Sequence, residues 1–541
     1  MIQDIEGARQ AVVLLLNLVE ELKQETLSQR AEIQRLRDEI NRLKGEQGKP
    51  DIKASKKPSE DDDHSSENER RQGRKPRKPK KRKKLKDVKI DREEYLEIDK
   101  AELPKDAKFK GYDPVIIQDL RIETDNVRFY QARYYSASEQ RNYVAPLPKG
   151  YKGQFGPTIR SLVISLYYAA GMSEPKIIEL LEQMGVNISD GKVSSLLTKE
   201  TEPWQAEADD IMAAGLGSSS WQHIDDTGTR VNGVNGYCHI VCNPFYTAYA
   251  TRPKKNRLTV IALLQNSEKP LFLFTQQTEE WLGKFETPLW ARRQIAEWPR
   301  GKLLEEQEIT DLLSKGMSTR LTQQQQARIY EAGALTAYYA QDKYPVIPIL
   351  VSDDAPQFRH LTQEHALCWI HEGRHYKKLQ PQVAYHQEIL NKVLTQFWQY
   401  YHELQAYRAS PDTEKAGALR HEFTAIFSQT TDYEQLNQRL AKTLAHEKKL
   451  LVVLDHPEIP LHNNPAELGA RQRVRKRDVS FGPRTEEGRI AWDSFMTVAE
   501  TAKKLGISFY QYVLDRVSQE NAMPSLADVI YFRGQSMLAS S

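Results

Sequence analysis

Residues 220–257 read SWQHIDDTGTRVNGVNGYCHIVCNPFYTAYATRPKKNR. In this stretch β-branched and aromatic residues alternate with polar ones between clusters of Gly, Asn and Pro, which predicts short strands separated by turns. The expected strands are residues 220–229, 236–243 and 246–252. A basic segment containing Lys254 and Lys255 then begins a helix. The stretch therefore predicts three successive strands followed by a helix.

A fourth strand is expected at residues 345–352 (PVIPILVS), an apolar run of the kind that lies buried in a sheet. Before it, residues 277–342 are rich in Gln, Glu, Arg and Leu and predict an inserted helical module. A ribonuclease-H-like sheet begins with elements in this order: three strands, a helix and a further buried strand. We therefore expect a ribonuclease-H-like α/β catalytic core over residues 211–515, predominantly helical after the fourth strand.

Three carboxylates stand where such a sheet could bring them together. Asp225 lies within the first strand, Asp353 ends the fourth, and Glu467 begins a helix in HNNPAELGAR, residues 462–471. Mg²⁺ prefers oxygen ligands and retains waters, so the set predicts a two-ion Mg²⁺ site, with Mn²⁺ as a substitute. A single acidic residue at a strand end is usually a solvated cap, and only the ordered set is informative.

Cations near these carboxylates are candidate DNA contacts. Arg471 and Arg475 follow Glu467 at i+4 and i+8, which would place them beside a bound phosphate backbone. The alternative is salt bridging on an exposed helix. Lys254 and Lys255 are included among the candidate DNA-binding residues.

Cys368 and His371 have the i, i+3 spacing of one helical turn and could form half of a metal site. Because no second pair accompanies them, a structural role beside the sheet is the preferred interpretation. His223 lies two residues before Asp225 and is interpreted as a core histidine, with substrate contact as the alternative.

The N-terminal segment, residues 1–45, has a heptad repeat over residues 12–43. β-branched residues at one apolar position and Leu at the other favour two parallel strands. The two positions are occupied by Val12, Val19, Thr26, Ile33 and Ile40, and by Leu15, Leu22, Gln29, Leu36 and Leu43. We expect a coiled coil that makes the protein a homodimer or a higher homo-oligomer; the alternative is an amphipathic helix packed on its own chain.

Residues 46–88 are polar and without periodicity, which predicts a disordered basic linker. A cluster of cations in this linker should neutralise DNA phosphates, unless it serves only solubility. The candidate contacts are Arg70, Arg71, Arg74, Lys75, Arg77, Lys78, Lys80, Lys81, Arg82, Lys83 and Lys84.

Two small units are expected before the core. Residues 89–150 predict a small β module, with a strand at residues 127–135. Residues 151–210 predict a helix-turn-helix-like unit, whose last helix would present Lys192 and Lys199 to DNA. The expected helices are residues 158–170, 174–184 and 190–199. Residues 516–541 are expected to form a C-terminal tail.

The composition limits the class of protein. A length of 541 residues suggests three or four units, so the expected fold class is multidomain α+β. No apolar run approaches the length that spans a bilayer. The three cysteines form no disulfide framework, which fits a reducing, cytoplasmic setting. Within the cytoplasm, we expect the protein to be nucleoid-associated. The net charge of +3 conceals an acidic patch followed by the basic cluster.

The segments LHNNPAELGAR (residues 461–471) and TVAETAKKLG (residues 497–506) together resemble the C-terminal signature of insertion-sequence-66 family transposases. In that family an Asn-Asn-x-Ala-Glu-Arg motif carries the catalytic Glu, which implies this role for Glu467. Asp225 similarly matches the family's Asp-Glu-Thr motif, and Asp353 its second acidic motif. The Cys-x-x-His segment that begins at Cys368 is also family-like.

The resemblance implies a DNA transposase that cleaves transposon ends and joins them to target DNA. It also implies that accessory proteins encoded by the element are possible partners. Asp226 replaces the family's usual Glu and Asp354 its usual Gly, which makes these two residues second-choice ligands. Residues 89–148 contain no Cys, so a zinc-binding module usual in the family has lost its metal ligands. The long spacing from Asp225 to Asp353 suggests that the helical insertion is particular to this branch.

Two alternatives remain open. The first is a ribonuclease-H-like nuclease that hydrolyses DNA without strand transfer. The second is an inactive or domesticated DNA-binding protein. Inverted repeats in the DNA that flanks the gene would favour transposition over both.

Overall fold

The computed structural model of the chain describes residues 5–43, 90–99, 104 and 107–538. Its centre is a five-stranded mixed sheet with the order β5-β4-β3-β8-β9. The first three strands are antiparallel neighbours, whereas β8 and β9 run parallel to β3. Their bounds are β3 Trp221–Val231, β4 Val234–Cys242, β5 Thr247–Arg252, β8 Ile349–Ser352 and β9 Glu364–Leu367. The three strands expected from residues 220–252 are confirmed.

The β3–β4 hairpin turns at Asn232-Gly233, where both residues have positive φ angles of 49° and 78°. Asn-Gly suits such a turn because both residues tolerate left-handed backbone conformations. The fourth strand is shorter than expected, since Pro345 and Pro348 offer no backbone N–H and β8 begins only at Ile349. The strand β9 was not expected, because its four residues, EHAL, show no apolar alternation.

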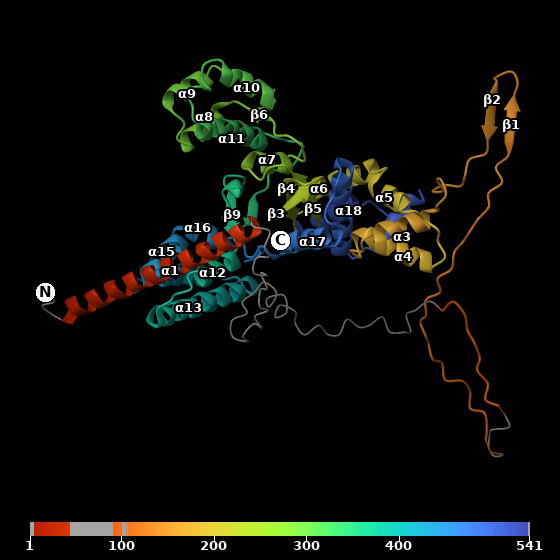
Figure 1. The fold of residues 1–541 in the computed structure, drawn as a ribbon, viewed down its shortest axis with the longest axis horizontal. Coiled ribbons are helices and arrows are strands. Elements are labelled where there is room, and N and C mark those ends of the chain that lie inside the picture. Colours follow the sequence, from red (N-terminus) through yellow and green to blue (C-terminus); the bar gives the residue numbers. More distant parts are fainter. Residues whose placement is uncertain (1–4, 44–89, 100–103, 105–106, 539–541) are drawn as a thin grey trace.

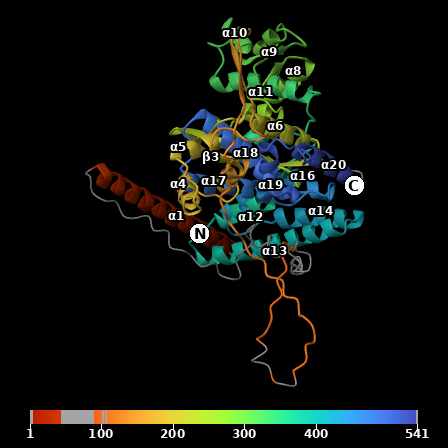
Figure 2. The same ribbon diagram turned by 90° about the vertical axis from the view of Figure 1, so that its right-hand side faces the viewer.

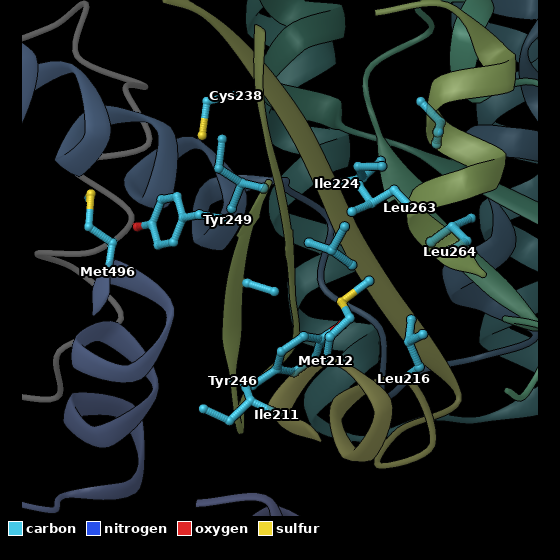
Figure 3. Close-up of a cluster of buried hydrophobic side chains, with 14 of the residues drawn as sticks. Ile211, Met212, Leu216, Ile224, Cys238, Tyr246, Tyr249, Leu263, Leu264 and Met496 are labelled. Carbon is cyan, nitrogen blue, oxygen red and sulfur yellow. The ribbon is translucent and has the colours of Figure 1, made fainter. Parts of the chain in front are cut away.

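Helices cover both faces of this sheet. Ile240 pairs with Asp225, and on their face α17 (Asn464–Ser480) packs over β3 and β4. A Cβ at Gly469 would lie 2.8 Å from Ile240, so this glycine allows α17 its close approach. Ile224 points to the other face, where Figure 3 shows it beside Leu263 of α7 (Arg257–Leu264). In the same view, Met496 lies near Tyr249.

The outer edge of the sheet is closed by side chains of α18 (Glu486–Leu505). Every second backbone N–H of β5 donates to a side chain of this helix, and successive acceptors are one helical turn apart. The donor and acceptor pairs are Thr251 and Asp493 (2.7 Å), Tyr249 and Thr497 (3.0 Å), and Thr247 and Thr501 (3.2 Å). An edge strand with unpaired N–H groups invites pairing with other chains, and α18 prevents it here.

Two helical insertions interrupt the sheet order. The expected first insertion is confirmed between α7 and β8, and Figure 1 shows it as a green lobe beyond α7. It also contains a short β6–β7 pair that the sequence did not indicate. Its elements are β6 Phe272–Leu273, α8 Gln276–Lys284, α9 Leu289–Ile295, β7 Leu303–Leu304, α10 Glu306–Ser314 and α11 Gln323–Tyr339.

A second insertion lies between β9 and α17 and was not recognised in the sequence. Its buried side chains, among them Trp369, Phe397 and Phe423, belong to a hydrophobic cluster separate from the main core. The prediction that this part of the chain is predominantly helical is confirmed. The insertion itself was not predicted, because helical periodicity does not reveal which hydrophobic core a helix belongs to. Its helices are α12 Trp369–Lys377, α13 Ala384–Ala409, α14 Thr413–Phe427, α15 Glu434–Ala445 and α16 Glu447–Leu450.

The segments before the sheet agree only in part with expectation. Helices occupy the three expected ranges, with α3 Pro157–Tyr168, α4 Glu174–Gln183 and α5 Asp190–Thr198, followed by α6 Glu202–Leu216, and the helix-turn-helix-like role of this unit stays a prediction. In the described part of residues 90–150, the strands are only β1 Arg133–Ser136 and β2 Arg141–Val144. The strand expected at residues 127–135 is therefore confirmed only over residues 133–135, and apolar side chains such as Ile117 and Leu120 stay exposed where a compact module would bury them.

Helices form both ends of the described chain. The first helix, α1, spans Ile5–Leu43, as the heptad repeat predicted. The expected tail contains α20 (Leu526–Leu538), which follows α19 (Phe509–Val517) and packs on α6. Of the helices that the structure describes, none has the length and apolar character needed to cross a membrane. The basic linker, including Arg70 to Lys84, lies outside the described residues.

Candidate active site

Asp225 and Asp353 meet on neighbouring parallel strands. His223 pairs with Val351, and continuing this register by two residues brings Asp353 beside Asp225. Asp225 Oδ1 accepts a hydrogen bond of 2.8 Å from the N–H of Asp226, and Asp353 Oδ1 accepts one of 3.1 Å from Ala355. Both carboxylates are thus fixed by the backbone next to them, and each keeps a second oxygen for a ligand.

Glu467 completes the set from the first turn of α17. Burial and the negative charges of Asp353, Glu467 and Asp226 raise the pKa of Asp225 from its ordinary value of 3.8 to about 7. Such mutual repulsion means that these carboxylates lie close together, and within the described residues the protein cations beside them contact Glu467 and Asp226 but not Asp225. The atom Glu467 Oε1 is buried and has no hydrogen-bond partner. A divalent cation fits these observations, because it would neutralise the charges and use the unpaired oxygen.

Asn463 positions Glu467 against the sheet. Its side-chain Nδ2 donates to the carbonyl of Ile224 (2.7 Å), and its Oδ1 lies 3.0 Å from His223 Nδ1. Its backbone N–H donates to the Sγ of Cys368 at 3.2 Å. One buried residue therefore ties the start of α17 to β3 through its side chain and to the start of α12 through its backbone N–H. His223 is buried and burial lowers its pKa to about 3, in agreement with the core interpretation.

Two side chains of α12 contact Glu467. Arg374 donates to its Oε2 at 3.2 Å, and His371 Nδ1 lies 3.7 Å from its Oε1. Within the described residues, Cys368, His371 and Glu467 place ligand atoms within 4.8 Å of one another. Burial raises the pKa of Cys368 to about 12, so the thiol stays protonated at neutral pH. Cys368 is thus buried behind Glu467, and His371 faces the carboxylate site.

The second-choice carboxylates are engaged elsewhere. Asp226 lies 3.5 Å from Lys255 and accepts a hydrogen bond of 2.9 Å from Gln357. Asp354 is held by Arg359 at 2.7 Å and by Lys449 at 3.0 Å. Although burial alone would raise the pKa of Asp354, the hydrogen bonds and charges of these two cations lower it. Asp226 and Asp354 are thus paired with protein cations, as Glu467 is with Arg374, whereas no ion pair of Asp225 or Asp353 is found within the described residues.

A known protein family matches the part of the chain that carries this site. The model of the family described as Transposase IS66 family matches residues 152–273 and 321–490, more than half of the chain. The chain belongs to this family. The matched regions contain Asp225, Asp353 and Glu467 and leave out residues 274–320, which hold α8, α9 and α10 of the first insertion.

A curated relative is also similar to this IS66-family chain. It is an uncharacterized protein, y4jO, of Sinorhizobium fredii (strain NBRC 101917 / NGR234). The two are 30% identical over 321 residues, which make up 59% of this chain and 99% of the relative.

The candidate DNA-binding cations of this transposase have different surroundings. Lys255 lies at the carboxylate site, with its Nζ 5.4 Å from the ring centroid of Tyr237. Arg475 and Lys199 are exposed, and Lys192 is half-buried on α5. Lys254 is exposed, and Arg471 lies half-buried on α17.

Two buried cations of α17 were missed in the sequence. Arg473 donates to Thr251 Oγ1 at 2.9 Å and lies 3.1 Å from the Asp493 carboxylate. Lys476 donates to the carbonyl of Tyr167 at 2.7 Å, which joins α17 to α3. The available signal was their spacing of seven and ten residues from Ala466, which places all three on one face of the helix. Cations on a helix are usually read as solvent-exposed, and here that reading is wrong.

The raised pKa of Asp225 makes the metal-free protein sensitive to pH. In the folded state this carboxyl holds its proton up to about pH 7, whereas in the unfolded chain it loses the proton near its ordinary pKa of 3.8. Its contribution to stability is therefore lost as the pH rises towards 7. In a chelating buffer at pH 8, Asp225→Asn should raise Tm by about 2 °C or more, since one pKa unit corresponds to about 1.4 kcal/mol.

The same comparison at pH 5 should show a much smaller difference, because the wild-type carboxyl is then mostly protonated. Asp354→Asn is the matched control and should lower Tm at pH 8, because it removes the partner of Arg359 and Lys449. A lower Tm for Asp225→Asn at pH 8 would contradict the repulsion between the carboxylates.

Proposed function

We propose that this IS66-family transposase cleaves DNA at the ends of its element and joins the freed 3′-hydroxyls to target DNA. The observation that carries the proposal is the convergence of Asp225, Asp353 and Glu467 from two strands and a helix. Two Mg²⁺ ions held by these carboxylates would supply the charge that activates the attacking oxygen and stabilises the leaving oxygen. Mn²⁺ should substitute for Mg²⁺.

The chain's own residues have defined tasks in this proposal. Asn463 holds Glu467 against β3 through its hydrogen bond to Ile224. Arg374 donates to Glu467 Oε2 and leaves Oε1 free for a ligand. Lys255, at the margin of the site, would neutralise a phosphate of the bound strand.

The assay uses a DNA duplex that carries the element's ends, a target plasmid and Mg²⁺. Cleavage at the ends together with joined products would support transposition. Cleavage without joining would favour the nuclease alternative, and the absence of both reactions with retained DNA binding would favour the noncatalytic one.

The basic linker should add affinity for DNA of any sequence. Replacing the Lys and Arg of residues 70–84 by Gln should flatten the slope of log affinity against log salt, by about 0.9 for each phosphate contact that is lost. Fluorescence anisotropy between about 50 and 200 mM salt measures this slope. A matched variant with the acidic residues 60–63 replaced by Asn or Gln should not flatten it. An unchanged slope in the basic variant would show that the linker does not contact DNA phosphates.

A further inference from the structure

The loop of residues 354–360 connects Asp353 at the carboxylate site with the first insertion. Its 3-10 turn, η3 (Pro356–Phe358), contacts α7, and α11 of the insertion contacts α7 as well. At the end of the loop, the hydroxyl of Tyr339 on α11 donates to the carbonyl of His360 at 3.1 Å. The first insertion therefore holds the loop that begins directly after Asp353, although the family model leaves out α8, α9 and α10.

His360 ends this loop against aromatic side chains at the end of α8. Its backbone is left-handed, with a φ angle of 67°, and residues other than glycine in this conformation concentrate at functional sites. Its ring lies edge-on to Trp281 and Phe285, at centroid distances of 5.8 and 5.7 Å. Trp281 in turn stacks on Tyr339. His360 remains exposed, so the loop and the insertion form one continuous surface here.

Four cations act on the ring of His360, and we call these five residues the His360 cluster. The cations are Arg257, Lys284, Lys449 and Arg359. Partial burial and then the charges of these cations lower the pKa of His360 to about 4, so its ring is uncharged at neutral pH. The Nζ of Lys284 lies 4.4 Å from the ring centroid of Trp281, and the guanidinium of Arg257 lies 5.6 Å from that of Phe285. Such cation–π contacts hold both charges in place.

The His360 cluster has more positive than negative charge. Three of its cations share two carboxylates, Glu331 and Asp354. The fourth, Lys284, is exposed, and no ion pair of this residue is found within the described residues. An excess of cations on an exposed surface attracts the phosphates of nucleic acids and releases their counterions. The charge of the cluster therefore fits a DNA backbone.

The helix-turn-helix-like unit and the first insertion reach the carboxylate site from different directions. From Glu467, α17 runs to α3, which it contacts through the hydrogen bond from Lys476 to the carbonyl of Tyr167. From Asp353, the loop runs to the insertion. Figure 1 shows the two units on different sides of the central sheet. An element end that is held by α3 to α5 would therefore pass the carboxylates before it meets the insertion.

We propose that the His360 cluster binds the phosphate backbone of flanking DNA, the duplex that continues beyond the bond cleaved at the element end. The proposal rests on the proposed function, because it presupposes cleavage at the ends. Lys284 makes the main phosphate contact, since it is held over Trp281 without a carboxylate partner. The helices that the family model leaves out thus add affinity for DNA on the side of the cut that faces away from the element.

The test compares two duplexes in a chelating buffer, which prevents cleavage, with the full-length protein. One ends at the cleavage site, and the other continues for roughly 10 base pairs, about one helical turn, beyond it. Wild-type protein should bind the longer duplex about tenfold more tightly. Lys284→Gln should weaken binding of the longer duplex about fivefold and flatten its slope of log affinity against log salt by about 0.9. Binding of the shorter duplex should stay within about twofold.

Two further variants separate a phosphate contact from other effects. Lys284→Arg keeps the charge and should keep the wild-type preference for the longer duplex. Lys315→Gln is the matched control, because Lys315 is exposed directly after α10, which Figures 1 and 2 show at the end of the insertion away from the sheet. It should bind both duplexes as the wild type does.

Three results would overturn the flanking-DNA site. They are equal affinity of the wild type for the two duplexes, an equal loss with both duplexes in Lys284→Gln, and the same loss in Lys315→Gln. A different result bears on the proposed function. If the wild type prefers the longer duplex but cuts neither duplex in Mg²⁺, the flanking-DNA site stands and cleavage at the element ends is wrong.

Discussion

Replacing Asp225 or Asp353 by Asn, or Glu467 by Gln, is expected to reduce both DNA cleavage and strand joining by a factor of about 10³ or more. The amides keep the shape of the side chains and remove the charge that holds the metal ions. DNA binding should stay within about twofold, because phosphate contacts depend on the cations and not on these acids. A double replacement should be little worse than a single one, since the ligands act as a unit.

The assay measures cleavage and joining of element-end DNA with Mg²⁺ and again with Mn²⁺. Asp226→Asn and Asp354→Asn are the matched controls, because both acids are paired with protein cations. Their losses should stay below about tenfold. If Glu467→Gln joins DNA at the wild-type rate while either control abolishes joining, the wrong carboxylates have been assigned. If all five replacements are silent, the two-metal mechanism fails.

Removing Asp493 is expected to cost about 3 kcal/mol or more of the free energy of unfolding. Its carboxylate accepts hydrogen bonds from Thr251 and forms ion pairs with Arg473 and Arg489. Arg473 is only 1% exposed, so Asp493→Ala leaves a buried guanidinium without its counter-charge. It also uncovers a backbone N–H of the edge strand β5. Denaturant titration of the full chain measures the loss.

A double variant separates the charge effect from the loss of packing. Adding Arg473→Met to Asp493→Ala should recover part of the lost stability, because the unpaired buried charge is then removed as well. Glu500→Ala on the same helix is the matched control and should stay within about 0.5 kcal/mol, since its partner Lys503 is largely exposed. If Asp493→Ala is as mild as this control, the buried network contributes no stability.

The sequence predicted those features of the fold that follow from periodicity. Strands β3, β4 and β5 were found because apolar and polar residues alternate between turns, and the Asn232-Gly233 turn fits this pattern. Strand β9 was missed because four residues are too few to show alternation. The second insertion was missed because helical periodicity does not report which neighbours a helix packs against.

The candidate site was predicted as a set of residues, and its supporting contacts were not. Asp225, Asp353 and Glu467 stand out because they follow one another in the right order, the first within a strand, the second at the end of a strand and the third at the start of a helix. Asn463 reads in the sequence as an ordinary helix cap, although it ties three elements together.

The order in which the ribosome makes this protein has a consequence for the carboxylate site. Asp225 and Glu467 lie about 240 residues apart, and at about 5 to 20 residues per second the second emerges between about 10 and 50 seconds after the first. During that interval the nascent polypeptide carries the first acidic residue without α17 to cover its face of the sheet. Translation that stops before residue 467 should therefore yield a product that lacks the complete carboxylate site.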